Sequence, residues 1–304
     1  MTYSAAANNH FSPPEMRVIS GIHSNIPLVL VTVLDKYQFN PELLNLKEYC
    51  LIDFCEYEWD KSDFTDTHVF GKNTNDFAFR FKGDEWKKFD EWVAGNPPKI
   101  YFKRELLKKD ATEWLQPIEY PFYGQIPETQ TKEQFDARPV NVFHYFGRSH
   151  EARIKAHADF WLSGAAICDN IHFFNDFIQK EECKNKWVSF HIAHYSRYDI
   201  SYLMQINGLS KLALSMPGAG KKCFRTAEVS SSSLMIMEHS NMAWQFQWID
   251  GVNYIGYKHK PVSIIKDALE HTDTLYPVYV AGVENARNYQ FDNYTRHLEK
   301  IIND

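Results

Sequence analysis

The sequence has few cysteines and none in a Cys-x-x-Cys pair. Five are scattered through 304 residues, which favours free thiols in a reducing compartment over a disulfide framework or a zinc site. We therefore expect a cytoplasmic protein. A long apolar run is also missing: the longest, residues 26–34, is far too short to span a bilayer. The N-terminal residues lack a basic region followed by an apolar run, so no signal peptide is expected.

An excess of basic residues is missing too. The net charge of −6 argues against a general nucleic-acid binder. No Asp-x-Asp motif, internal repeat or low-complexity tract occurs beyond four consecutive serines. What is present is ordinary globular composition, with 44% hydrophobic and 24% charged residues. Aromatic residues are frequent, at 15%; such rings are common where sugars bind, although most of them will be core.

Strand and helix patterns alternate along the chain, which predicts an α/β fold with a parallel sheet in each half. Residues 1–15 are polar and are expected to be loose. The predicted strands cover residues 26–34, 49–57, 99–102, 140–146, 187–193, 212–216, 234–237 and 254–257. The predicted helices cover residues 84–94, 150–162, 199–207, 261–269 and 284–302.

A proline-containing stretch, residues 116–139, separates the two halves and predicts an interdomain connection. We expect two Rossmann-like domains facing across a cleft, one over residues 1–135 and the other over residues 136–304. The N-terminal half has no glycine fingerprint, so it is expected to bind the acceptor. The C-terminal half is expected to bind the nucleotide. A tail helix, residues 284–304, is expected either to stay there or to pack back on the N-terminal domain.

The segment from Tyr195 to His239 carries most of the chemistry. A short apolar strand is followed by a turn with Gly218 and Gly220, where backbone amides can approach a phosphate without a Cβ in the way. The following helix start presents unpaired N–H groups to the anion. Groups suited to a diphosphate and a ribose diol follow: Lys221, Lys222, Arg225 and Glu228. The alternatives are an ordinary strand-to-helix turn and a surface pair between Arg225 and Glu228.

A second cationic turn follows the strand at residues 140–146. Arg148 comes directly after Gly147, where a diphosphate would lie at the end of a parallel strand. Arg153 follows five residues later and is equally compatible with a surface position. Histidines at positions 150, 157, 191 and 194 lack a carboxylate or cysteine to complete a metal site, so a structural role is favoured.

These two blocks resemble the donor-binding region of exostosin-like glycosyltransferases. The matching features are Tyr202, Ser210-Lys211, the Pro217-Gly218-Ala219-Gly220 turn, Cys223-x-Arg225-x-x-Glu228, and the block from Arg138 to Arg148 with Arg153. The resemblance covers about the last half of the chain. It departs from the family where Val229 and four serines replace small residues and a glycine.

The resemblance implies a GT-B enzyme that moves a hexosyl or pentosyl group from a nucleotide sugar, expected to be UDP-linked, to a hydroxyl of a glycan acceptor. No metal and no separate cofactor are expected, because cations can stabilise the departing diphosphate. The donor-binding residues would be Arg148, Arg153, Tyr195, Pro217, Gly218, Gly220, Lys221, Arg225 and Glu228, with Arg225 also acting in catalysis.

An acidic run, Glu56 to Asp60, leaves two further alternatives open. Its acids at alternate positions would suit a metal-dependent GT-A transferase, with Glu56, Glu58 and Asp60 holding the ion. In the GT-B interpretation, Glu56 or Asp60 supplies the base that an inverting enzyme needs. Asp35 and His23 are further candidates for that base, and any one of these residues can equally be a surface group. A non-catalytic carbohydrate- or nucleotide-binding protein is the remaining alternative.

Overall fold

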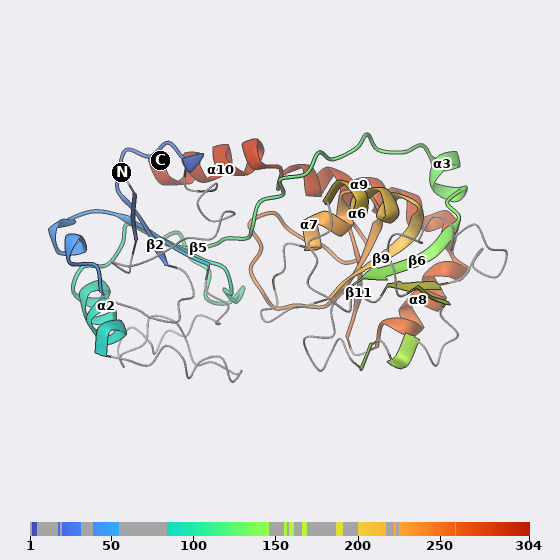
Figure 1. Cartoon of the computed structure of the whole chain (residues 1–304), viewed down its shortest axis with the longest axis horizontal. Helices are drawn as coiled ribbons and strands as arrows, with labels where there is room; N and C mark the ends of the chain where they lie inside the picture. The colour runs from blue at the N-terminus through green and yellow to red at the C-terminus, as the bar shows by residue number, and fades with distance from the viewer. Residues whose placement is uncertain are drawn as a thin grey trace.

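The computed structural model describes residues 2–4, 18, 20–31, 39–54, 84–145, 155–156, 158–160, 166–168, 187–190, 200–216, 222, 225–258 and 260–304. Its strands form two sheets, and all the pairings within them are parallel (Figure 1). We call the sheet β1–β5 with the elements packed on it the first lobe, and the sheet β6–β11 with its helices the second lobe. The parallel α/β architecture predicted from the alternating pattern is confirmed.

The strands of the first sheet lie side by side in chain order. They are β1 (Thr2–Ser4), β2 (Leu28–Val31), β3 (Cys50–Asp53), β4 (Ile100–Lys103) and β5 (Leu115–Pro117). Every residue of β2, β3 and β4 is buried, as expected for parallel strands covered on both faces. Helix α2 (Asp84–Gly95) contributes Phe89 and Val93 to the core on one face, as its spacing predicts.

The second sheet has the order β11-β10-β9-β6-β8-β7. Its strands are β6 (Val140–Tyr145), β7 (Ala166–Cys168), β8 (Trp187–Phe190), β9 (Ser210–Ser215), β10 (Leu234–Glu238) and β11 (Ile255–Tyr257). β6, which comes first along the chain among the strands of this sheet, therefore lies inside the sheet. The chain continues from β6 toward β7 and β8 on one side and from β9 toward β10 and β11 on the other. The carboxyl ends of β6 and β9 form a topological switch point, where α/β proteins bind ligands.

Helices cover the second sheet. The helices of this lobe are α6 (Ile200–Gly208), α7 (Arg225–Ser230), α8 (Pro261–Glu270) and α9 (Leu275–Arg287), with the short 3-10 turn η6 (Thr272–Thr274) before α9. Helix α7 packs against β9, β10 and α9, whereas α8 packs against β10 and β11. The core between them is apolar and includes Leu214, Ile236, Ile265 and Val283.

The connection between the sheets runs along α9. It contains α3 (Lys132–Asp136), which begins with a capping box between Thr131 and Gln134. The Tyr276 hydroxyl donates to the Gln130 carbonyl at 2.9 Å, and the Arg287 guanidinium donates to the Pro127 carbonyl at 3.2 Å. These contacts hold the connection on the second lobe (Figure 1).

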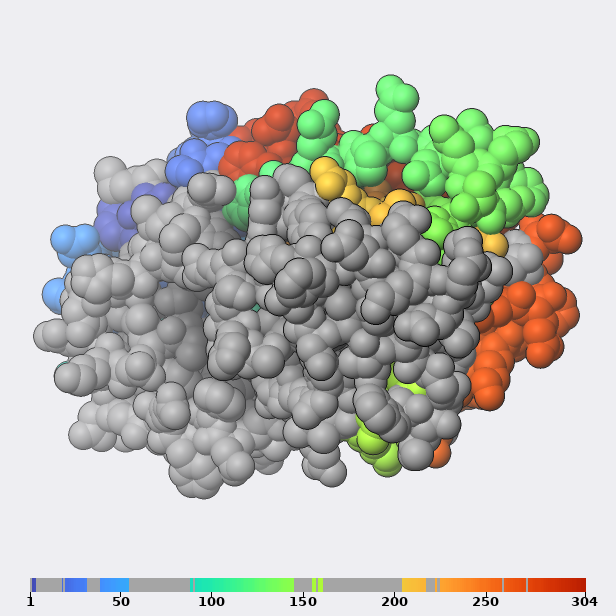
Figure 2. Space-filling model, turned by 45° about the vertical axis from the view of Figure 1, so that its right-hand side comes forward, coloured from blue at the N-terminus to red at the C-terminus, as the bar shows by residue number. Residues whose placement is uncertain are grey.

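The prediction of a single helix over residues 284–302 is wrong. Helix α9 ends at Arg287, and α10 (Phe291–Asn303) begins after a break. The break pairs with the connection: Phe122 N–H donates to the Tyr289 carbonyl at 2.7 Å, and Phe291 N–H donates to the Phe122 carbonyl at 3.2 Å. Helix α10 then packs on the first sheet, where Tyr294, Leu298 and Ile302 join its core. Red α10 atoms lie beside blue N-terminal atoms in Figure 2.

Several short elements were not predicted. Residues 2–4 form β1 instead of a loose end, and β5 and β7 are also three-residue strands. The 3-10 helix η1 (Pro41–Asn45) is capped by the Asn40 side chain, which accepts from Glu42 N–H at 3.1 Å. Within the described residues, no helix has both the length and the apolar character needed to cross a membrane.

Candidate functional site

The switch point brings together the two loops that sequence analysis singled out. The aligned register of β6 and β9 pairs Val140 with Ser210 and Phe143 with Ala213, so the two strands end at the same edge of the sheet. The arginine turn starts after Tyr145, and the glycine turn starts after Met216. The described residues exclude Arg148, Arg153, Tyr195, Pro217, Gly218, Gly220 and Lys221, and also Asp35, Glu56, Glu58 and Asp60. Only the strand ends that carry the two loops are therefore placed.

Arg225 and Glu228 are described, and both lie in α7. Arg225 is the first residue of the helix and 8% exposed; Glu228 lies in the first turn and is 6% exposed. The Thr226 and Ser215 hydroxyls are 3.1 Å apart, which joins the first turn of α7 to the last residue of β9. The helix therefore begins next to the switch-point edge.

The four serines that differ from the exostosin-like pattern lie at the end of α7 and directly after it. All four, residues 230–233, are buried. Ser230 Oγ donates to the Gly282 carbonyl at 2.8 Å, and Ser231 Oγ donates to the Glu228 carbonyl at 2.7 Å. Small hydroxyl side chains thus let α7 approach α9 closely and bond carbonyls there. Helix α7 ends at Ser230, which defines the helix end that the sequence left open.

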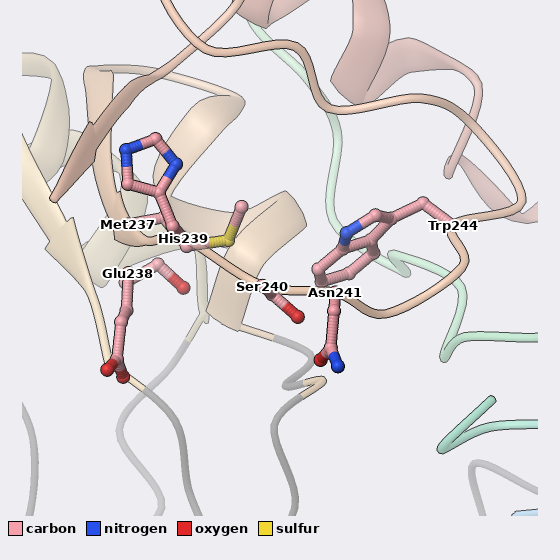
Figure 3. Close-up of a pocket in the computed structure, with 7 residues that line it drawn as sticks. Met237, Glu238, His239, Ser240, Asn241 and Trp244 are labelled. Atoms are coloured by element: carbon pink, nitrogen blue, oxygen red, sulfur yellow. The ribbon is translucent and has the colours of Figure 1, made fainter. Parts of the chain in front are cut away.

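A cavity of about 140 Å³ lies at the carboxyl ends of β9 and β10. Its lining residues are Ser215, Met237, Glu238, His239, Ser240, Asn241 and Trp244. In Figure 3, the Trp244 ring and the Met237 sulfur lie beside the cavity, while the Glu238, Ser240 and Asn241 side chains point toward one side of it. None of these residues was predicted as a site residue, although the place of residues 238–244 directly after the predicted strand 234–237 is a signal that finds them.

His239 is fixed on the rim of this cavity. Its Nε2 lies 3.4 Å from Asp250 Oδ2, and its backbone N–H donates to the Tyr257 carbonyl at 2.7 Å. The ring lies over Gly256, where a Cβ would come within 2.4 Å of the ring. Gly256 N–H in turn donates to Asp250 Oδ1 at 2.6 Å. Glycine at position 256 is therefore needed for this arrangement.

The structure corrects the expectation that Lys222 adds charge to a phosphate site. Its ammonium lies 2.5 Å from Glu119 Oε1 and its side chain is 1% exposed, so its charge is balanced inside the protein. Burial raises the pKa of the Glu119 carboxyl and lowers the pKa of the Lys222 ammonium, and their mutual attraction opposes both shifts. Lys221 and Arg225 remain the cations expected to face a diphosphate.

His23 is also corrected as a candidate base. It precedes β2, near the start of β1, and so lies at the amino ends of the first sheet's strands. Its backbone N–H donates to Glu299 Oε1 at 2.7 Å, which ties it to α10. This edge is opposite the carboxyl ends that would face a cleft. In the described part of the chain, no group of three acidic, histidine or cysteine side chains is arranged to hold a metal ion.

No family model and no curated protein matches this sequence. Solved structures do match over nearly its whole length. HepE of Anabaena, solved with UDP and glucose, is 10% identical over 98% of this chain and 98% of that one, with a TM-score of 0.53. A glycosyltransferase from Rickettsia africae is 12% identical over 99% and 97%, with a TM-score of 0.52. A UDP-forming α,α-trehalose-phosphate synthase from Burkholderia vietnamiensis is 8% identical over 96% and 78%, with a TM-score of 0.50.

These similarities concern the fold. The chain has the GT-B architecture, two parallel α/β units as expected from the sequence, and its similarity to glycosyltransferase structures spans both lobes.

Proposed function

We propose that the chain is a GT-B glycosyltransferase that moves a sugar from a nucleotide sugar, UDP-linked, to a hydroxyl of a glycan acceptor. One observation carries the proposal. The second sheet reverses its strand order between β6 and β9, and the arginine turn and the glycine turn follow those two strands. Ligands of open α/β sheets bind at such a point. The fold similarity to HepE, solved with UDP and glucose, supports UDP as the nucleotide.

The residues of the proposed donor site have different roles. Gly218 and Gly220 let backbone N–H groups reach the diphosphate. Arg148, Lys221 and Arg225 stabilise its charge as the sugar leaves, in place of a metal ion. Glu228 accepts from the ribose hydroxyls. Further lining residues are Arg153, Tyr195 and Pro217.

The cavity beside β10 extends this site. Ser215 belongs to the cavity and also contacts the first turn of α7, so the cavity and Arg225 adjoin one strand end. Its volume of about 140 Å³ is below the about 300–1,000 Å³ of pockets that hold whole ligands. It would therefore take one part of the donor, with Trp244 offering an aromatic face and Asn241 an amide.

The acceptor is assigned to the first lobe, whose strands end on the opposite side of the proposed cleft. For an inverting reaction, Glu56 is our choice for the base and Asp60 the second choice, because the acidic run follows β3. The exostosin-like grouping rests on the Cys223-to-Glu228 pattern. A cytoplasmic location rests on the expectation of free thiols; among the described residues, Cys50 is free and buried.

Turnover of a panel of nucleotide sugars, with and without EDTA, tests the function. We expect slow release of UDP from one UDP-sugar that continues in EDTA and accelerates when the correct glycan acceptor is added. Loss of turnover in EDTA would favour the metal-dependent alternative built on Glu56, Glu58 and Asp60. Binding of UDP without turnover of any donor would favour a non-catalytic binding protein.

A further inference from the structure

Lys222 fastens the glycine segment, residues 217–228, to the first lobe. Its backbone N–H donates to Glu105 Oε1 at 3.1 Å. Its ammonium bonds to Glu119 Oε1 at 2.5 Å and to the Ile118 carbonyl at 3.4 Å. Glu105 follows β4 and Glu119 follows β5. Both carboxylates therefore reach from the carboxyl ends of the first sheet to Lys222, which belongs to the segment proposed to bind the diphosphate.

Glu119 holds a second part of the proposed donor site. Its two oxygens each accept from the Gln245 backbone N–H, both at 3.2 Å. Gln245 directly follows Trp244, which lines the cavity beside β10. The Lys222 ammonium lies 5.3 Å from the centroid of the Trp244 ring, within the range of a cation–π contact. The Glu119 carboxylate thus bonds both to Lys222 of the glycine segment and to Gln245, next to the cavity-lining Trp244.

Backbone contacts make this junction continuous. Ala243 N–H donates to the Leu106 carbonyl at 2.7 Å, and Lys108 N–H donates to the Asn241 carbonyl at 2.8 Å. In Figure 3, the green ribbon of the first lobe's chain passes next to the loop carrying Trp244. The connection between β4 and β5 therefore lies along the segment that lines the cavity.

We propose that Glu119, paired with Lys222, is a positioning residue through which the acceptor lobe sets the geometry of the donor site. The proposal rests on the glycosyltransferase function above and deepens it. Neither residue touches the substrate in this account. Glu119 acts by holding residues 217–228 and Trp244 in one arrangement relative to the first lobe, so that donor and acceptor meet in a fixed register. Misalignment of the reacting groups lowers the reaction rate, even when the residue change that causes it lies far from them.

A second buried carboxylate provides a matched control. Asp53 lies 3.0 Å from the Lys103 ammonium, both side chains are fully buried, and Tyr101 donates to Asp53 Oδ2 at 2.7 Å. All three residues belong to the first sheet. Asp53→Asn therefore removes a carboxylate from a buried lysine pair, as Glu119→Gln does, and the bonds given above for Asp53 are to residues of the first sheet.

The experiment compares Glu119→Gln, Asp53→Asn and the double variant Glu119→Gln/Lys222→Met. It measures Tm, the Kd of UDP by calorimetry, and kcat/KM for the donor. We expect Glu119→Gln to lower kcat/KM by up to about a hundredfold and to weaken UDP binding. Asp53→Asn should lower Tm but leave UDP binding unchanged. The proposal is overturned if Glu119→Gln binds and turns over the donor like the parent protein.

The double variant separates positioning from stability. It leaves no uncompensated buried charge, so Tm should recover relative to Glu119→Gln. The bond to Gln245 N–H is then weaker, and the side-chain bond between residues 119 and 222 is gone, which leaves only the backbone bond to Glu105, so kcat/KM should stay low. Recovery of both Tm and kcat/KM in the double variant would show a purely structural pair and overturn the proposal.

A further readout keeps the inference separate from the proposed function. If the parent protein binds no UDP and turns over no nucleotide sugar, the function fails, but amide hydrogen exchange still tests the link. Peptides covering residues 217–224 should exchange faster in Glu119→Gln than in the parent or in Asp53→Asn. Equal exchange in Glu119→Gln and the parent would overturn the inference on its own terms.

Discussion

The two lobes are both parallel sheets, but they order their strands differently. In the first lobe, the described strands β1 to β5 follow one another in chain order. In the second lobe, β6 lies between β9 and β8, and the order reverses there. A reversal opens a crevice at the strand ends and a steady progression does not. Strand order therefore supports the proposal that the nucleotide binds to the second lobe, independently of the glycine turn.

The connections between strands also distinguish the two lobes. The link between β4 and β5 does not return through a helix; residues 104–114 pass along the second lobe and bond to Asn241 and Ala243. Two carboxylates that follow strands of the first sheet, Glu105 and Glu119, also bond to Lys222 of the other lobe. The second lobe keeps its switch-point edge next to a cavity instead. In the proposed account, the first lobe supports the donor site and the second lobe contains it.

The largest expected effect comes from Arg225, on the second lobe. Arg225→Ala should lower kcat by about 10²–10³-fold, or about 2.7–4 kcal/mol of transition-state stabilisation, because it removes one preorganised cation from the leaving diphosphate. Steady-state kinetics with the best donor measure this effect.

Arg138→Met is the matched control. Arg138 is a buried arginine of the same lobe, but it donates to the Ser210 carbonyl at 2.5 Å, at the amino end of β9. It should lower Tm and leave kcat unchanged. Parent-like turnover by Arg225→Ala would remove Arg225 from the mechanism.

A smaller effect is expected from Glu228, which acts on binding. Glu228→Gln keeps the shape but loses the charge that accepts from the ribose, a change on the scale of about 1.5–3 kcal/mol for a hydrogen bond to a charged group. KM for the donor should rise while kcat stays constant. A fall in kcat with an unchanged KM would assign Glu228 to the chemical step instead.

The smallest effects distinguish the packing of the two lobes. A Cβ on Gly282 would lie 2.8 Å from the Asn253 carbonyl oxygen and 3.1 Å from Ser230 Oγ, whereas a Cβ on Gly95 would meet open space. Gly282→Ala should therefore cost about 1–3 kcal/mol of unfolding free energy through overpacking.

Gly95→Ala, at the end of α2 in the first lobe, should be neutral or stabilising by up to about 1 kcal/mol. Urea unfolding of the two variants measures the difference. Equal midpoints would mean that α7 and α9 are not packed as closely as described.

Local sequence patterns predicted the long elements of both lobes. The apolar run 26–34 contains β2, and the spacing of Phe89, Trp92 and Val93 corresponds to α2. Strands of three residues, such as β1 and β5, are too short to give a period. The break between α9 and α10 depends on hydrogen bonds between Phe122 and residues 289 and 291, a contact that helical spacing in the tail cannot reveal.

The same holds for the candidate site: its local features could be predicted from the sequence, and its contacts with the other lobe could not. Strand ends and the glycine turn can be read locally, so the edge formed by β6 and β9 follows from the pattern. The partner of Lys222 cannot be read that way, because Glu119 comes from the other lobe. A lysine beside two glycines suggests a phosphate ligand, and only the fold shows that this one is paired. The cavity residues after β10 carry no motif, and their role follows from position alone.

A crystal structure with UDP and Mn²⁺ tests the central claim, that the second lobe's switch point holds the diphosphate without a metal ion. We predict a diphosphate between the loops that follow β6 and β9, near Arg225 and the Gly218–Gly220 turn, with no ion bound to it. Density for an ion that bridges the diphosphate to Glu56, Glu58 or Asp60 on the first lobe would contradict the account.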